Sequence, residues 1–250
     1  MQRRFSLLLI FVPLLLKAQT TPDASEIIRK AEDQLRGNSS EASISMSVIR
    51  PDYTRNVSFK SWSLGDDYGL TLIIAPARDQ GMAFLKRGRE VWNWQPSIDR
   101  SIKMPPSMML QGWMGSDLTT EDLVRQNSIL NDYDHKLLAD ANVDGNLCYT
   151  IALTPKEQAA VVWGKLIMYI GKSDYLQYKT EFFDEDMELV NTITGKVPRT
   201  FGSRTVLTEL EVIPKGKPGH KTIFKYDALE FDVEVQESFF SLQNLKRLRP

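Results

Sequence analysis

The amino-acid sequence predicts a mainly β protein of the α+β class, built on one strongly curved antiparallel sheet. Roughly ten or eleven short strand patterns follow one another with turn residues between them, and only about two or three helices are predicted. The regular alternation of strands and helices that a parallel sheet needs is missing. Because strand twist accumulates across so many strands, the sheet should curl and form a concave face. Helices, a loop or a ligand must fill that face.

One amphipathic helix is predicted before the strands. Asp23 and Glu26 have the spacing of a capping box, and Gly37 is suited to the C-terminal end of the helix. The apolar residues between them share one helical face: Ile27, Ile28, Ala31 and Leu35. We expect this face to pack on the sheet.

The first strands are predicted from a change to a period of two. Apolar residues alternate with serines, as on a half-buried strand: Ala42, Ile44, Met46 and Val48. In the next strand Val57 and Phe59 share one face, whereas Trp62 and Leu64 share the other. This change of phase predicts a bulge near Ser61. A third strand follows from the apolar residues Tyr68, Leu70, Leu72 and Ile74.

The later strands follow the same pattern with short turns. Residues 81–86 and 90–95 flank Arg87-Gly88-Arg89 as a hairpin, and Asp144-Gly145 is a strong signal for another. Further strands are predicted at 147–153, 165–170, 176–183, 188–194, 204–212 and 221–226. No repeat or long linker divides them, so we expect a single domain.

The stretch from Val91 to Val124 contains three of the five tryptophans and four of the nine methionines. After Trp92 and Trp94, which lie two apart as on one strand face, it becomes rich in Gly, Pro and Ser. Large apolar groups on irregular backbone would form an exposed patch unless they covered something. We therefore predict that this stretch forms a flap over the concave face. The residues leave open whether it is a permanent plug or a gate over a ligand pocket.

The flap should end in a short helix. Asp117 or Thr119 is suited to its N-cap, and Glu121 and Asp122 fall in the first turn, where the helix dipole favours acids.

Composition and charge exclude several classes of function. The 31 basic and 32 acidic residues nearly cancel, so there is no electrostatic basis for binding nucleic acid or an anionic membrane. The only cysteine, Cys148, excludes an intrachain disulfide and is expected on a buried strand.

Catalytic and metal-binding motifs are missing from the sequence. His135 and His220 are the only histidines, and neither lies in a metal-ligand or nucleophile motif. Asp117 and Asp122 have the residue types of a glycosidase acid and base, but helix capping explains both more simply. We therefore predict that the protein is not an enzyme and uses no metal or cofactor.

The N-terminal residues predict export. Arg3 and Arg4 precede an apolar run at positions 5–16 and the small residue Ala18, as in a secretory signal peptide cleaved after Ala18. The apolar run is too short to span a bilayer comfortably. We expect residues 1–18 to be the signal peptide and residues 19–250 to form the domain.

Together these features resemble the outer-membrane lipoprotein-sorting proteins of the LolA-like family, in its larger and uncharacterised branch. The resemblance rests on the exported N-terminus, the many strands, the stretch VWNWQPSIDRSIKMPPSMMLQGWMGSDLTTEDLV and the closing residues 239–245, FFSLQNL. Its most specific part is Trp113-Met114-Gly115-Ser116-Asp117 with Asp122-Leu123 downstream.

The resemblance implies an incomplete β-barrel in which helices act as a lid over an apolar cavity. It implies a periplasmic carrier, expected to be monomeric, that binds the acyl chains of a lipid or lipoprotein for transfer towards the outer membrane. An inner-membrane transporter and an outer-membrane acceptor are its implied partners. The alternative is a periplasmic sensor or adaptor of the same fold, which binds an envelope protein without transporting lipid.

Candidate acyl-binding residues come from the flap and from the strands expected to face it. They are Met46, Val48, Phe59, Leu72, Ile74, Phe84, Trp92, Trp94, Met104, Met108, Met109, Trp113 and Met114. The well-studied carrier of the family has a functional arginine, for which Arg50, Arg55 and Arg78 are the candidates in this chain.

Overall fold

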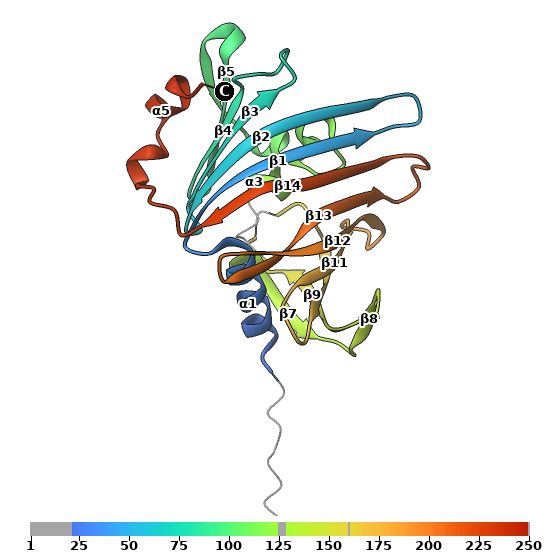
Figure 1. Ribbon diagram of the computed structural model, residues 1–250. Coiled ribbons are helices and arrows are strands. Elements are labelled where there is room, and N and C mark those ends of the chain that lie inside the picture. The colour runs from blue at the N-terminus through green and yellow to red at the C-terminus, as the bar shows by residue number, and fades with distance from the viewer. Residues whose placement is uncertain (1–21, 125–128, 160, 250) are drawn as a thin grey trace, which may run out of the picture.

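The computed structural model describes residues 22–124, 129–159 and 161–249 (Figure 1). The expected signal peptide, residues 1–18, lies outside them. One curved sheet of 14 strands runs in the order β6-β5-β4-β3-β2-β1-β14-β13-β12-β11-β10-β9-β7, with β8 beside β9. The terminal strands β6 and β7 are not neighbours in this order, so the sheet is an incomplete barrel. The predicted fold class is confirmed.

The sheet has two halves that meet where β1 pairs with β14. The first half contains β1 (Ser39–Ile49), β2 (Thr54–Leu64), β3 (Tyr68–Ala75), β4 (Ala83–Arg87), β5 (Glu90–Gln95) and β6 (Arg100–Lys103). The second half contains β7 (Tyr133–Leu137), β8 (Ala141–Val143), β9 (Asn146–Pro155), β10 (Lys165–Gly171), β11 (Gln177–Phe183), β12 (Leu189–Phe201), β13 (Arg204–Pro214) and β14 (Lys221–Phe231). A short helix, α4 (Ile129–Asp132), precedes β7, and a 3-10 turn, η1 (Pro96–Ile98), follows β5.

The predicted N-terminal helix is α1 (Ala24–Arg36), and it packs on the second half of the sheet (Figure 1). Ile27 and Ile28 are buried in a cluster with apolar residues of β9 and β10. Gly37 ends the helix, as predicted, with a positive φ of 63° and a ψ of −164°, a combination that only glycine adopts readily. The capping box is not formed, because the Asp23 side chain makes no capping hydrogen bond and Glu26 pairs with Arg29 at 2.8 Å.

The C-terminal segment covers the face of the first half that points away from the flap. It contains η4 (Glu237–Phe239) and α5 (Leu242–Arg247), which lies beside β4 (Figure 1). Phe240 and Leu245 are fully buried against Leu70, Leu72 and Leu85. Within the described residues, no helix is long and apolar enough to cross a membrane.

The predicted bulge near Ser61 is wrong. The pairing of β2 with β1 continues without a break through Ala42 and Ser61, and the register of β2 shifts only against β3, between Ser58 and Phe59. Trp62 instead turns to the far face, where its ring meets Phe239 with 5.5 Å between centroids. Small hydroxyl side chains therefore stay on the concave face at this end of the strand.

Candidate functional site

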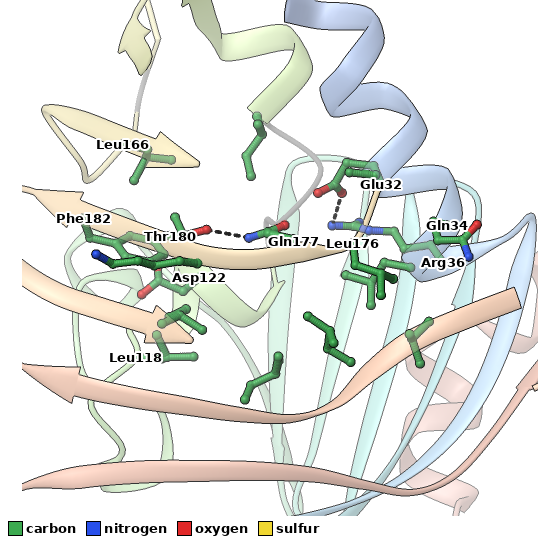
Figure 2. Close-up of a pocket in the computed structure, with 18 of the residues that line it drawn as sticks. Glu32, Gln34, Arg36, Leu118, Asp122, Leu166, Leu176, Gln177, Thr180 and Phe182 are labelled. Carbon is green, nitrogen blue, oxygen red and sulfur yellow. Dashed lines mark hydrogen bonds and ion pairs between the residues drawn. The ribbon is translucent and has the colours of Figure 1, made fainter. Parts of the chain in front are cut away.

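Three adjoining hollows lie inside the curved sheet. The first, of about 150 Å³, lies beneath α1 and is mainly apolar (Figure 2). The second, of about 140 Å³, lies between the end of α1 and strands β1–β4, and the third, of about 150 Å³, lies beneath Trp113. Leu35 borders the first and second, Leu118 the first and third, and Ile44 the second and third. The three hollows therefore adjoin one another through shared side chains inside the curved sheet.

The flap closes one side of this space, as the sequence predicted. It consists of α2 (Pro106–Met109), η2 (Trp113–Gly115) and α3 (Thr120–Val124). Trp113 is only 4% exposed, and its ring lies 5.1 Å from that of Phe59 and 5.6 Å from that of Phe84. Gly112 is required here, because a Cβ would lie 2.8 Å from the Ser116 carbonyl oxygen. The Trp113 side chain is the apolar anchor of the closed flap.

A buried ion pair holds the next turn of the flap to the sheet. Arg50 donates through Nη1 to the Asp117 carboxylate at 2.9 Å and through Nη2 to the Gly115 carbonyl at 2.9 Å. The Thr222 hydroxyl also donates to Asp117, at 2.7 Å, and Asn191 donates to the Asp117 carbonyl. The two charged side chains are 11% and 5% exposed. Asp117 therefore joins the flap to β1, β12 and β14.

A second arginine contacts the same turn. Arg55 donates through Nη1 to the Met114 carbonyl at 2.9 Å and pairs with Asp79 at 2.7 Å. Arg78, in contrast, is 73% exposed and contacts only the other side of Asp79. Of the three candidate arginines, Arg50 and Arg55 thus contact the flap from the sheet, whereas Arg78 is exposed beside Asp79.

The sequence predicted Asp117 or Thr119 as the N-cap of α3, and the structure decides between them. The Asp122 N–H donates to the Thr119 hydroxyl at 3.1 Å, and the Thr119 N–H donates to the Asp122 carboxylate at 2.7 Å. This reciprocal arrangement makes Thr119 the cap. Asp117 as the N-cap is wrong, because its carboxylate is engaged by Arg50 and Thr222.

Asp122 links the flap to the second half of the sheet and lines the first hollow (Figure 2). The Trp163 indole N–H donates to its carboxylate at 2.6 Å. Burial raises the pKa of Asp122 above its usual range, and the hydrogen bonds from Trp163 and Thr119 offset part of this rise. The carboxyl group thus titrates at a higher pH in the folded chain than in the unfolded chain.

The raised pKa of Asp122 should make the stability of the fold depend on pH. A carboxyl whose pKa is raised by folding stabilises the fold most below its unfolded pKa, and that contribution is lost as pH rises through the folded pKa. The free energy of unfolding of wild type relative to Asp122→Asn should therefore fall as pH rises above about 4, by at most about 1.4 kcal/mol for each unit that the pKa is raised. Urea unfolding of both proteins across this range measures it. A difference that stays constant or rises with pH would contradict the assignment.

Most of the candidate acyl-binding residues are brought together around the flap. Those in the cluster that contains Trp113 are Met46, Val48, Phe59, Phe84, Met104 and Met114. Met108 and Met109 lie on α2, where Met109 is buried and Met108 half-buried.

Four candidates lie on the wrong face of the sheet for this role. Leu72, Ile74, Trp92 and Trp94 pack with the C-terminal segment around Phe240 and Leu245. Successive side chains of a strand point to opposite faces, and Ile73, the residue between Leu72 and Ile74, is the one that joins the Trp113 cluster. Their placement beneath the flap was a wrong prediction.

The second half of the sheet and α1 supply walls of the cavity that the sequence did not predict. Apolar residues that line the first hollow are Leu166, Leu176, Phe182, Ile193, Val206, Leu207 and Leu210. Glu32 and Arg36 project into it from α1 (Figure 2). The period-2 pattern of β10–β13 marked the apolar residues as strand residues, but only the curl of the sheet brings them opposite the flap.

His135 has a structural role in the described residues. Its Nδ1 lies 2.8 Å from the Ser25 hydroxyl and its Nε2 lies 2.9 Å from the Ile129 carbonyl oxygen, so it joins α1, α4 and β7. Neither ring nitrogen is directed at the cavity by these contacts.

Comparison with solved structures identifies the fold. A DUF1329 family protein from Desulfovibrio piger has a TM-score of 0.82 at 22% identity, with 89% of this chain and 97% of the other covered. A domain named as an outer membrane lipoprotein-sorting protein, from Vibrio parahaemolyticus, has a TM-score of 0.80 at 21% identity, with 90% and 98% covered. A LolA superfamily protein from Nitrosomonas europaea has a TM-score of 0.77 at 22% identity, with 90% and 100% covered.

These likenesses define the class of protein as one with the LolA-like fold, in agreement with the resemblance of its sequence. A family model described as an uncharacterized protein matches residues 65–247, which is more than half of the chain. The chain therefore belongs to this family. A comparison with curated proteins gives no match.

Proposed function

We propose that the protein is a periplasmic carrier that binds acyl chains of a lipid or lipoprotein in the interior space and passes them towards the outer membrane. The observation that carries the proposal is a pair of adjoining, mainly apolar hollows beneath a flap that a few side chains hold to the sheet. An inner-membrane donor and an outer-membrane acceptor belong to the same proposal, which the shared fold of a lipoprotein-sorting domain supports.

The apolar walls supply the affinity in this proposal. Each methylene group removed from water contributes about 0.8 kcal/mol, so a chain of about a dozen methylenes gains roughly 10 kcal/mol before the costs of ordering are subtracted. The summed volume of the three hollows is comparable with that of an ordinary ligand pocket, whereas the volume of each hollow alone is smaller. An acyl chain would therefore run through more than one of them.

The flap supplies the means of release. The Trp113 ring and the Arg50–Asp117 pair favour the closed state, and cargo enters or leaves when both contacts are broken. A partner that binds the open state better than the closed state would shift this equilibrium without any nucleotide. This is the gate alternative for the Met- and Trp-rich stretch.

The binding test uses a fluorescent fatty acid and displacement by unlabelled chains. We expect saturable binding by wild type, and about tenfold weaker binding by Leu210→Trp, which fills the wall shared by the first and third hollows. Leu242→Trp, at an exposed residue of α5, is the control and should bind as wild type does. Absence of binding at micromolar probe would refute the carrier.

A further inference from the structure

The second hollow differs chemically from the other two. Its floor carries hydroxyl groups beside aliphatic side chains, and among its lining residues the only charged ones are Arg36 and Lys86. Both are cations. The hydroxyl-bearing residues are Ser40, Ser61, Ser63 and Thr71 on the strands and Tyr226 at the margin.

The floor changes from polar to apolar in successive rows across β1–β4. The outer row pairs Ser40 with Ser63, Ser63 with Gly69, and Gly69 with Lys86. Two positions further along each strand, the next row contains Ala42, Ser61, Thr71 and Phe84. The row after that contains Ile44, Phe59 and Ile73, which lie beside the Trp113 cluster. An amphiphile lying along this floor would place its polar head beside the row that contains Ser40, Ser63 and Lys86 and its chain beside the apolar row.

The two cations are placed with donor capacity at the hollow. Arg36 pairs with Glu32 through Nη2 at 2.7 Å, while its Nε is buried and has no hydrogen-bond partner among the described residues. The Lys86 side chain is on a residue only 8% exposed, and its Nζ donates to the carbonyl of Asp66, a residue in the exposed turn before β3. An arginine guanidinium has five donors, and the Nε–H of Arg36 is the one that the structure leaves without a partner among the described residues.

Glu32 is the internal competitor for Arg36. Burial raises the pKa of the Glu32 carboxyl, and the positive charge of Arg36 offsets part of this rise. A bound anion would share the guanidinium with a carboxyl group that desolvation already makes costly to ionise. Removing the Glu32 charge should then favour the anion.

We propose that this end of the cavity is a subsite for the anionic oxygen group, carboxylate or phosphate, of an amphiphile whose chain lies in the apolar hollows. Arg36 and Lys86 are its charged donors, and the serine and threonine hydroxyls complete it. The inference rests on the proposed function and adds to it the class of head group that the carrier selects.

Competitors with acyl chains of equal length and different head groups test the anion subsite separately from the carrier function. Hexadecanoate and hexadecanol are compared as competitors of the fluorescent probe at about pH 8, where a free carboxylic acid is ionised. Lysophosphatidylglycerol and lysophosphatidylcholine of equal chain length form the phosphate arm, with a net negative and a zwitterionic head. We expect wild type to prefer each anionic competitor by about tenfold, as for a charge-assisted hydrogen bond. The arm with the larger preference identifies carboxylate or phosphate as the source.

Variants assign that preference to the two cations. Arg36→Gln and Lys86→Gln should each weaken binding of the anionic competitors by about threefold, their shares of the tenfold preference, and leave hexadecanol unchanged. Glu32→Gln should strengthen binding of the anions. Arg29→Gln, on the exposed side of α1, is the control and should change neither. Melting temperatures of all four identify any variant that fails to fold, and Lys86→Gln remains informative if Arg36→Gln does.

The outcomes distinguish the subsite from the carrier. Equal binding of hexadecanol and hexadecanoate by wild type, together with equal binding of the two lysolipids, would overturn the subsite and leave the carrier standing. Loss of hexadecanol affinity in the variants would also overturn it, because the two cations would then act only by shaping the cavity. Failure of every competitor to bind would refute both proposals.

Discussion

Trp113→Ala lowers the free energy of unfolding by about 3–5 kcal/mol, the usual cost of deleting a large aromatic side chain from a core. The ring is 4% exposed and packs against Phe59 and Phe84, so its removal leaves a cavity beside the third hollow. At about 2–4 °C for each kcal/mol in a chain of this size, the melting temperature falls accordingly. Because the same contacts hold the flap closed, uptake and release of a fluorescent acyl probe should both become faster.

Trp94→Ala is the matched control for this experiment. Trp94 is 5% exposed, but it packs with Phe240 and Leu245 on the face away from the flap. It should lower stability by a similar amount and leave the exchange of the probe unchanged. If both variants alter probe exchange equally, the effect comes from general loosening of the fold. If Trp113→Ala costs stability but leaves exchange unaltered, the flap is a permanent plug.

The chain order of helix and strands could be predicted because it depends on local patterns. The period of 3.6 in α1 and the period of two in β1 are both set by a single buried face. Turn residues such as Asp144-Gly145 mark the ends of strands by their own backbone preferences, and Gly145 has φ 89°. These signals extend over a few residues, so one chain is enough to identify them.

Which face of each strand lies towards the cavity could not be predicted in the same way. Both faces of the first half are buried, one by the flap and one by the C-terminal segment. Leu72, Trp92 and Trp94 are apolar on the far face for the same physical reason that Phe59 and Phe84 are apolar on the concave face. A two-sided core gives no polar residues to mark the outside. Phe59 lies 54 residues from its flap partner Trp113, and Leu72 lies 168 residues from its partner Phe240 on the other face.

The polar contacts of the site depend on the tertiary fold. Arg50 and Asp117 are 67 residues apart, and Trp163 and Asp122 are 41 apart. Local sequence suggested Asp117 as a helix N-cap in the flap, but Thr119 is the residue that caps the helix. Glu32 and Arg36 have the i and i+4 spacing of an ordinary surface pair on a helix. Only burial of this side of α1 against the curved sheet makes them part of the cavity.

Breaking the Arg50–Asp117 pair from one side should be as damaging as removing Trp113. Asp117→Leu leaves the Arg50 guanidinium, 11% exposed, without its carboxylate, and we expect a loss of about 3–5 kcal/mol in the free energy of unfolding. Arg50→Met should cost a comparable amount, because the Asp117 carboxylate is 5% exposed and keeps only the Thr222 hydroxyl as a side-chain donor. Both single variants should release the acyl probe faster than wild type.

The double variant Arg50→Met with Asp117→Leu decides whether the pair acts as a unit. Two apolar side chains of similar volume leave no buried charge unpaired, so we expect the double variant to be more stable than either single variant and the two losses to be non-additive by about 3 kcal/mol or more. Urea unfolding of the four proteins measures this coupling. Arg78→Met, at a side chain 73% exposed, is the control and should be neutral in stability and probe release. Simple addition of the two single losses would mean that Arg50 holds the flap through the Gly115 carbonyl and that its ion pair with Asp117 contributes little.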